Sequence, residues 1–336
     1  MIYRTNATLK IYKHMKITKF LFMALLTTCQ LVAFSQTSDK LPGKGLLQFD
    51  FFYAGEGKFH NMYIVRNGKI AWEYKDANSK GEISDAVLLT NENVLFAHQF
   101  GVTLISAKKK VLWNYDAPAG CEIHTAQPIG KNHVVFIQNG DTARLFVVNI
   151  KSGKTVKSFP LPVRNPKSVH GQFRHARLTS TGTILVAHMD MGKVCEYDSN
   201  GKELFQLNVP GIWSVEPLKN GNFLVTNKGF VTEFTHKGDT VWNCPLKSIQ
   251  EFKITSPQVA IRRPNGNTIV NNWFNQWSGN VDLTNPPVQA IELTPDKKVV
   301  WALSSWTAPA DLGPSTIIVP LNEPRTNENV FFGEFK

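Results

Sequence analysis

The stretch from Val169 to Arg177 holds the densest group of side chains that could carry chemistry. Its histidines and arginines are His170, Arg174, His175 and Arg177. Arginine can fork onto the oxygens of a carboxylate or sulfate, and histidine can move a proton near neutral pH. The stretch therefore predicts either a site for a small anionic ligand, with His175 catalytic if the protein is an enzyme, or a buried structural network.

His124 is a second candidate for a catalytic histidine, and an internal alignment relates it to the first group. Five segments end in similar turns, and their residues form columns when the turns are superposed. Nine residues before the last turn residue the column holds Ser84, His124, Arg174, Trp213 and Gln258. Six residues before it the column holds Val87, Gln127, Arg177, Glu216 and Ile261.

These columns vary in chemistry, as expected of ring positions that face an asymmetric ligand. Side chains alternate between the faces of a strand, so the nine-before column and the eight-before column, which contains Asp85 and His175, cannot both face one channel. The small residues seven before the turn favour the nine-before column at the channel mouth. The ligand-binding residues predicted here are Arg174, Arg177, His170, Trp213, Gln258, Gln127 and Glu216.

A tryptophan-rich segment, 271–277, is a separate candidate. Trp273 and Trp277 stand beside Asn271, Asn275 and Gln276. An indole face with amide donors and acceptors at its edge can bind a sugar. The same composition suits a long loop packed over a sheet, so Trp273 is predicted either to bind a carbohydrate or to pack.

A repeated strand positions these candidates. A turn, often Gly-Lys, leads into a strand that ends in a large aromatic residue, at Trp72, Trp113, Phe159, Phe205, Trp242 and Trp301. The copies are roughly 40 to 60 residues apart, the length of four short strands with their loops. No segment shows helical periodicity. The sequence predicts an all-β fold, a six-bladed β-propeller, over residues 46–336; a two-sheet sandwich would not explain the repeat.

The two ends of the chain are predicted to complete one blade together. Residues 315–321 resemble an inner strand, but the aromatic strand that should follow is missing there, while an orphan copy occurs at 68–72. Sharing a blade removes the exposed edges of an open sheet. Residues 46–55 and 330–335 compete for one strand of that blade, and the sequence does not decide between them.

The aromatic strands, especially residues 149–159, resemble the repeats of quinoprotein-like (PQQ-like) propellers. The eight blades, paired cysteines and calcium site of quinone-dependent members are not visible, so no cofactor and no metal site is predicted. A histidine followed by a Leu-x-Asn-Gly-Asn turn is similar to the arylsulfate sulfotransferases, six-bladed propellers with a nucleophilic channel histidine. That resemblance implies His124 or His175 as nucleophile and Arg174 or Arg177 at the sulfuryl oxygens.

The first 35 residues predict a cleaved secretory signal peptide. Basic residues precede an apolar run from Phe20 to Leu26, and Ala33-Phe34-Ser35 provides a small-x-small cleavage pattern. The run is too short and polar for a membrane span; a lipoprotein anchor at Cys29 is the less favoured alternative. Residues 36–45 would be a short linker, and the protein is predicted to be secreted or periplasmic, like propellers exported by Bacteroidetes-type bacteria that are linked to glycan use.

Net charge and cysteine content limit the classes of partner and cofactor that the chain is expected to bind. The formal net charge is +11, and removing residues 1–35 leaves +6 with scattered bases, which does not suggest nucleic-acid binding. Cys121, Cys195 and Cys244 lack metal-site spacing and allow one disulfide at most. Three functions follow: a propeller that binds an anionic or carbohydrate ligand; an enzyme, either arylsulfotransferase-like or a polysaccharide lyase or hydrolase, that uses His124 or His175; or a protein-interaction scaffold in the periplasm.

Overall fold

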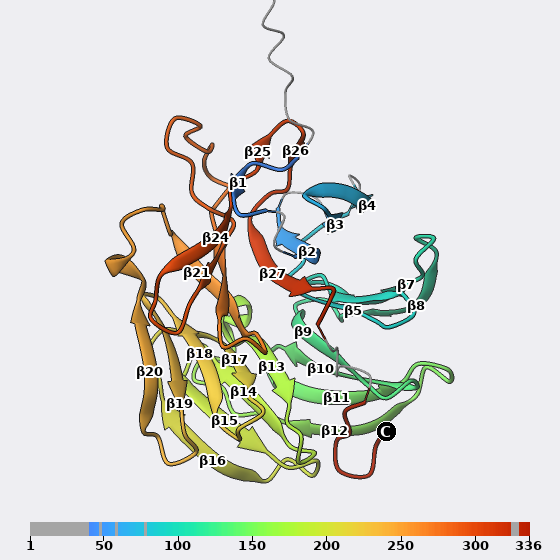
Figure 1. Cartoon of the computed structure of the whole chain (residues 1–336). Coiled ribbons are helices and arrows are strands. Elements are labelled where there is room, and N and C mark those ends of the chain that lie inside the picture. Colours follow the sequence, from blue (N-terminus) through green and yellow to red (C-terminus); the bar gives the residue numbers. More distant parts are fainter. Residues whose placement is uncertain (1–39, 47–48, 58–59, 77–78, 324–328) are drawn as a thin grey trace, which may run out of the picture. The chain divides into compact units, whose positions relative to one another are not determined.

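Short runs of β-branched and aromatic residues between Gly- and Asn-rich turns form antiparallel four-stranded sheets, arranged as the six blades of a propeller (Figure 1). The computed structural model describes residues 40–46, 49–57, 60–76, 79–323 and 329–336, so the predicted signal peptide lies outside the described residues. Among the described residues, no helix is both long enough and apolar enough to cross a membrane.

The blades are numbered here along the chain, and their strands run from the inner to the outer edge. Blade 1 comprises β27 (Ser315–Pro320), β2 (Phe51–Glu56), β3 (His60–Arg66) and β4 (Lys69–Asp76). Blade 2 comprises β5 (Asp85–Leu88), β6 (Val94–Ala97), β7 (Gly101–Ile105) and β8 (Val111–Asp116). Blade 3 comprises β9 (Glu122–Ile129), β10 (His133–Asn139), β11 (Arg144–Asn149) and β12 (Thr155–Pro160). Blade 4 comprises β13 (Phe173–Leu178), β14 (Ile184–His188), β15 (Lys193–Tyr197) and β16 (Glu203–Asn208). Blade 5 comprises β17 (Ile212–Pro217), β18 (Phe223–Asn227), β19 (Phe230–Phe234) and β20 (Thr240–Pro245). Blade 6 comprises β21 (Ser256–Arg262), β22 (Thr268–Trp273), β23 (Ala290–Leu293) and β24 (Val299–Leu303).

A few short elements lie outside this pattern. They are β1 (Gly43–Lys44), which pairs with β24 at the outer edge of blade 6; the hairpin of β25 (Trp306–Thr307) and β26 (Ala310–Asp311); and the 3₁₀ turns η1 (Val169–Gly171) and η2 (Leu246–Ser248).

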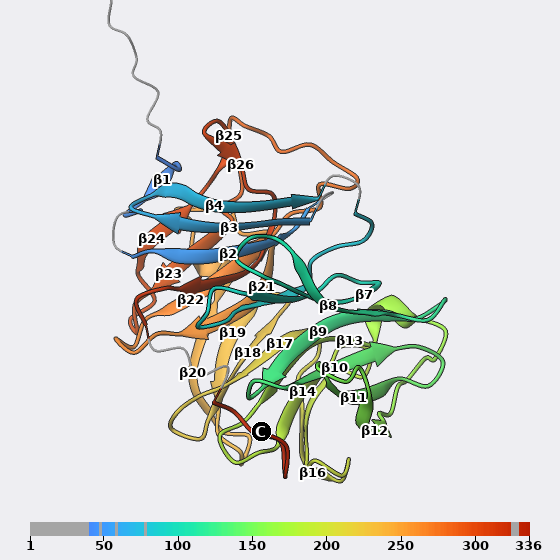
Figure 2. The ribbon, with the colours of Figure 1, turned by 90° about the vertical axis from the view of Figure 1, so that its right-hand side faces the viewer.

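Both ends of the chain build blade 1, as the sequence predicted. The C-terminal strand β27 is innermost and pairs with β2 from the N-terminal part (Figure 2). The inner strands contact one another all the way round, in the order β27, β5, β9, β13, β17, β21 and back to β27. Phe51–Glu56 (β2) fills the strand position for which residues 46–55 and 330–335 were the two candidates. Residues 330–335 form no strand of the blade, and Phe332 packs instead between blades 3 and 4.

The core consists of apolar clusters, each shared by two neighbouring blades. The repeated aromatic residue of the outer strand contributes to this packing. The indole N–H of Trp72 donates to the backbone oxygen of Ala107 in the next blade at 2.9 Å, and that of Trp242 donates to Pro295 at 2.8 Å. The aromatic repeat therefore records contacts between blades.

The Asn-Gly turns carry the positive φ angles that the sequence indicated. Gly221 and Gly266 have φ of 84° and 86°, a region that glycine enters without steric cost. In blade 2 a non-glycine residue, Glu92, takes the same place at φ 63°. The three cysteines named above are free thiols, with Cys195 and Cys244 buried.

Candidate functional site

Irregular pairing in the inner strands re-aims one side chain per blade. In β9, β13 and β17 one residue lacks a partner on the second strand, namely His124, Arg174 and Trp213 respectively. Thr316 holds the matching place in β27. Such β-bulges bend a strand and redirect its side chains. The bulged residues include most of the nine-before column, and they lie where the inner strands begin, which is the channel mouth.

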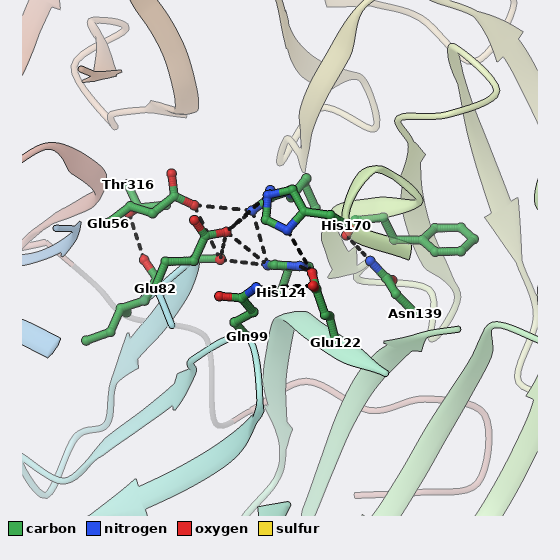
Figure 3. A network of polar contacts seen from close by, with 12 residues as sticks. Glu56, Glu82, Gln99, Glu122, His124, Asn139, His170 and Thr316 are labelled. Carbon is green, nitrogen blue, oxygen red and sulfur yellow. Dashed lines mark hydrogen bonds and ion pairs between the residues drawn. The ribbon is translucent and has the colours of Figure 1, made fainter. Parts of the chain in front are cut away.

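Polar side chains from blades 1 to 4 form one network at this mouth, called here the mouth cluster (Figure 3). Its members are Glu56, Glu82, Ser84, Glu122, His124, His170 and Arg174. The ring arrangement brings together residues that are far apart in the sequence. The structure thus unites three of the predicted residues, His124, His170 and Arg174, with carboxylates that the sequence analysis did not name.

Arg174 is the hub of the mouth cluster. Its Nη1 donates to Oε1 of Glu56 at 3.3 Å and to Oε1 of Glu82, and lies 3.1 Å from Nδ1 of His124. Its Nη2 contacts Nε2 of His170. The guanidinium carbon also lies 5.1 Å from the ring centre of Trp213, a cation–π distance. Because Arg174 is buried and shielded from water, its positive charge is balanced by carboxylates of the protein.

Glu122 orients both histidines of the cluster. Its Oε2 lies 2.8 Å from Nε2 of His124 and 2.8 Å from Nδ1 of His170. Gln99 holds its other oxygen at 3.1 Å. Since a carboxylate only accepts hydrogen bonds, each ring donates an N–H to Glu122, and its other ring nitrogen faces Arg174 and Glu82.

Burial and neighbouring charges set the ionisation of the cluster. Burial, together with the nearby Glu82, raises the pKa of Glu56 well above its usual range. Burial alone would raise the pKa of Glu82, but Arg174 and His124 outweigh it and lower that pKa to about 2. Burial and Arg174 lower the pKa of His124 to about 4, so this histidine is neutral at pH 7.

The same balance keeps a second carboxylate of the cluster ionised. Burial opposes ionisation of Glu122, but hydrogen bonds from His124 and His170 hold its pKa well below the usual range. Glu82 and Glu122 are therefore both ionised, against the one guanidinium of Arg174. Only one side of the cluster meets solvent: the side chains of His170 and Glu122 are 55% and 17% exposed, whereas that of His124 is fully buried.

The eight-before column joins neighbouring blades and does not enter the mouth cluster. His175 is buried, with Nδ1 3.0 Å from the backbone oxygen of Val215 in the next blade. Burial and the nearby Arg177 lower its pKa to about 3, which keeps it neutral. Asp85 likewise accepts hydrogen bonds from Thr125 at 3.0 Å and from the backbone N–H of Ala126 at 3.1 Å.

The six-before column lines a separate cavity of about 550 Å³ at the other end of the channel. Arg177 makes two hydrogen bonds of 2.7 Å to Asp85 and one of 3.1 Å to Glu216. Burial raises the pKa of Glu216 to about 7, although Arg177 opposes this shift. The amide oxygen of Gln127 accepts the backbone N–H of Leu178 at 2.8 Å. Arg177, Glu216 and Gln127 are thus already bonded within the protein.

Gln258 and Trp273 lie outside these networks. Gln258 holds the nine-before position in blade 6 and is fully buried, and neither polar atom of its amide has a partner among the described residues. Trp273 ends β22, half-buried. The other tryptophans of this part of the chain differ in their surroundings. Trp301 lies in the core, Trp277 is exposed, and Trp306 lines a hollow of about 620 Å³ together with Gln276.

Three carboxylates of the mouth cluster were missed from the sequence. Glu82 and Glu122 share one column, two residues before the nine-before column, so extending the alignment would have found them. Glu56 comes from the second strand of blade 1, which belongs to no aligned column. Only ring closure brings it within 3.3 Å of Arg174.

Comparisons with known proteins agree on the fold. No family model and no curated protein matches the chain. A Bacteroides caccae protein of unknown function superposes with a TM-score of 0.71 at 22% identity, covering 82% of this chain and 100% of that chain. A catalytically inactive virginiamycin B lyase from Staphylococcus aureus, solved with quinupristin, gives 0.53 at 12% identity, covering 79% and 88%. The WD40 propeller of Doa1 gives 0.52 at 14%, covering 67% and 72%. At these identities the likeness is one of fold.

Proposed function

We propose that the chain is an exported propeller that binds a carbohydrate at the channel mouth. The observation that carries this proposal is the solvent-facing edge of the mouth cluster. His170 is exposed and Glu122 partly exposed there, and Arg174, which contacts His170, also lies 5.1 Å from the ring centre of the half-buried Trp213. A carboxylate can accept hydrogen bonds from sugar hydroxyls, and an indole offers an apolar face for the ring. Such a site needs no charge on the ligand.

Charge favours a neutral saccharide over an anion. Arg174 is bonded to Glu56 and Glu82, and Arg177 is bonded to Asp85 and Glu216. An anionic ligand would have to displace carboxylates that already hold these guanidinium groups, and it would meet the ionised Glu122. The anionic ligand predicted from the histidines and arginines of residues 169–177 therefore has less support than the carbohydrate.

A calorimetric titration tests the proposal. The probes are a panel of neutral oligosaccharides, acidic oligosaccharides and aryl sulfates. We expect binding of a neutral oligosaccharide that weakens at least tenfold in Trp213→Ala and in Glu122→Gln.

Trp242→Ala is the matched control, since Arg262 lies 4.9 Å from the Trp242 ring as Arg174 lies beside Trp213, yet this pair belongs to the outer strand of blade 5. Binding that Trp242→Ala weakens as much as Trp213→Ala would count against the site. Absence of binding throughout the panel would shift the weight to a protein partner.

A second candidate function is an enzyme, either a polysaccharide lyase or a hydrolase. One observation favours it: Glu122 fixes the ring of the exposed His170 at 2.8 Å, as a base that removes or delivers a proton requires. His124 is less accessible, and His175 lies between blades. An arylsulfotransferase has less support, because Arg174 and Arg177 are both engaged. His170→Ala should abolish turnover of a bound polysaccharide and leave the melting temperature unchanged.

Export is proposed from the charge and hydropathy pattern of residues 1–35. The proposed kinship with propellers exported by Bacteroidetes-type bacteria rests on the same pattern, and the Bacteroides caccae protein shares the fold. The PQQ-like character of the repeats rests on the aromatic strands. These strands pack between blades and do not reach the channel mouth, so they suggest ancestry and not quinone binding.

A further inference from the structure

We propose that the mouth cluster binds a divalent transition-metal ion through Glu82, His124 and His170. Oε1 of Glu82 lies 3.4 Å from Nδ1 of His124 and 4.0 Å from Nε2 of His170, and the three atoms all lie within 4.8 Å of one another. Ligand atoms bound tetrahedrally at about 2.1 Å are about 3.4 Å apart. A small movement of the exposed His170 would close the set. This proposal does not depend on carbohydrate binding.

The hydrogen bonds of Glu122 point to the same conclusion. Metal-binding histidines generally donate their second ring N–H to a carboxylate or carbonyl, which fixes the tautomer and aims the free lone pair at the ion. Here Glu122 accepts from both His124 and His170 at 2.8 Å, and the other two ring nitrogens converge beside Glu82, where they now face Arg174. Oγ of Ser84 also lies 2.9 Å from Nδ1 of His124. Two imidazoles and one carboxylate suit zinc, cobalt, nickel or iron better than calcium or magnesium.

The guanidinium of Arg174 now lies where the three ligand atoms converge. It contacts Glu82, His124 and His170, so it stands in for a cation at that point. Its carbon already lies 5.1 Å from the Trp213 ring centre, and Glu56 accepts from its Nη1 at 3.3 Å. Arg174 can therefore withdraw toward Trp213 and Glu56 when a metal ion enters, keeping two of its interactions.

The proposed site would leave room for chemistry. Three protein ligands to a tetrahedral ion leave one position for water or a ligand hydroxyl. His170 is the exposed ligand, so that position would open toward the solvent side of the mouth. A metal-bound hydroxyl at this place would join the metal site to the proposed carbohydrate site.

The test is a titration of the untagged, chelator-treated chain with Co²⁺ and then Zn²⁺, followed by the visible absorption of Co²⁺ and by calorimetry. We expect one equivalent of Co²⁺ that Zn²⁺ displaces. Affinity should fall at least tenfold in His170→Ala and in Glu82→Gln, and by about 10- to 100-fold in Glu122→Gln, which removes the orienting carboxylate. Arg174→Met should bind more tightly, because the competing cation is gone.

His236→Ala is the matched control. His236 is also exposed and lies 2.9 Å from a carboxylate, that of Glu196, but among the described residues it belongs to no group of three side chains that could hold a metal ion. Its loss should leave Co²⁺ binding unchanged. The proposal is overturned if the wild-type chain binds no stoichiometric Co²⁺, or if folded His170→Ala and Glu82→Gln proteins bind it as the wild type does. Neither result involves a saccharide, so both are separable from failure of the carbohydrate proposal.

Discussion

Replacing Arg177 by methionine would leave a buried carboxylate without its counter-charge. Asp85 is 1% exposed and receives two hydrogen bonds of 2.7 Å from Arg177. Although burial opposes ionisation of Asp85, Arg177 holds its pKa below the usual range. Removing one partner of such a buried pair costs about 3–5 kcal/mol. We expect Arg177→Met to lower the free energy of unfolding by that amount.

Equilibrium unfolding in guanidinium chloride measures this cost, and a double variant tests its origin. Asp85→Asn removes the charge and keeps an oxygen that can accept the backbone N–H of Ala126. The double variant should therefore be more stable than Arg177→Met alone. Lys44→Met is the control: it breaks an exposed ion pair with Glu251 and should cost at most about 1 kcal/mol.

A loss below about 1 kcal/mol for Arg177→Met, comparable with that of an exposed pair, would refute this reasoning. It would mean that Arg177 is not committed to Asp85. The guanidinium would then be free to bind an anion, and the preference for a neutral ligand would lose one of its supports.

Three further predictions test the packing and the turns of the blades. The pKa of His175 is about 3 in the folded protein against 6.5 in the unfolded chain, so the stability that neutral His175 contributes is complete above pH 6.5 and is lost as pH falls toward 3. Between pH 7 and pH 5 the free energy of unfolding of the wild type should fall by about 2 kcal/mol more than that of His175→Gln, as measured by equilibrium unfolding at each pH. Gly221→Ala should cost about 1–2 kcal/mol, because its φ is +84° with open space around a Cβ, whereas Gly182→Ala should cost more, because the Cβ would lie 2.3 Å from the Phe331 ring; equal melting temperatures would contradict this. Phe332→Ala should cost about 3–5 kcal/mol, because this side chain is fully buried between blades 3 and 4; an unchanged unfolding midpoint would show that the C-terminal segment does not pack there.

The repeat predicted the blades well because each copy reflects turn geometry within a blade and packing against the next blade. The turn positions need positive φ, and aromatic residues contact the next blade, so similar residues recur from copy to copy. Ring closure was only partly predictable. Residues 46–55 and 330–335 are both apolar and β-prone, and the choice between them depends on pairing with β27 across the whole chain.

The site was predictable where it follows the column pattern and, for His170, where basic residues crowd the stretch 169–177. His124, Arg174 and Trp213 share one register position, and bulges bring all three to the mouth. The aligned residues did not reveal Glu56, which arrives from the second strand of blade 1. Residue type alone made His175 as attractive as His170. Its contact with Val215 depends on the position of the neighbouring blade, which no local pattern records.

A crystal structure of the chain with the tightest-binding oligosaccharide would test the location of the site most directly. We expect the sugar at the channel mouth, hydrogen-bonded to Glu122 with a ring face against Trp213. Density for the sugar in the cavity beside Arg177 and Glu216, or in the hollow lined by Trp306, with the mouth cluster unchanged, would contradict the central claim.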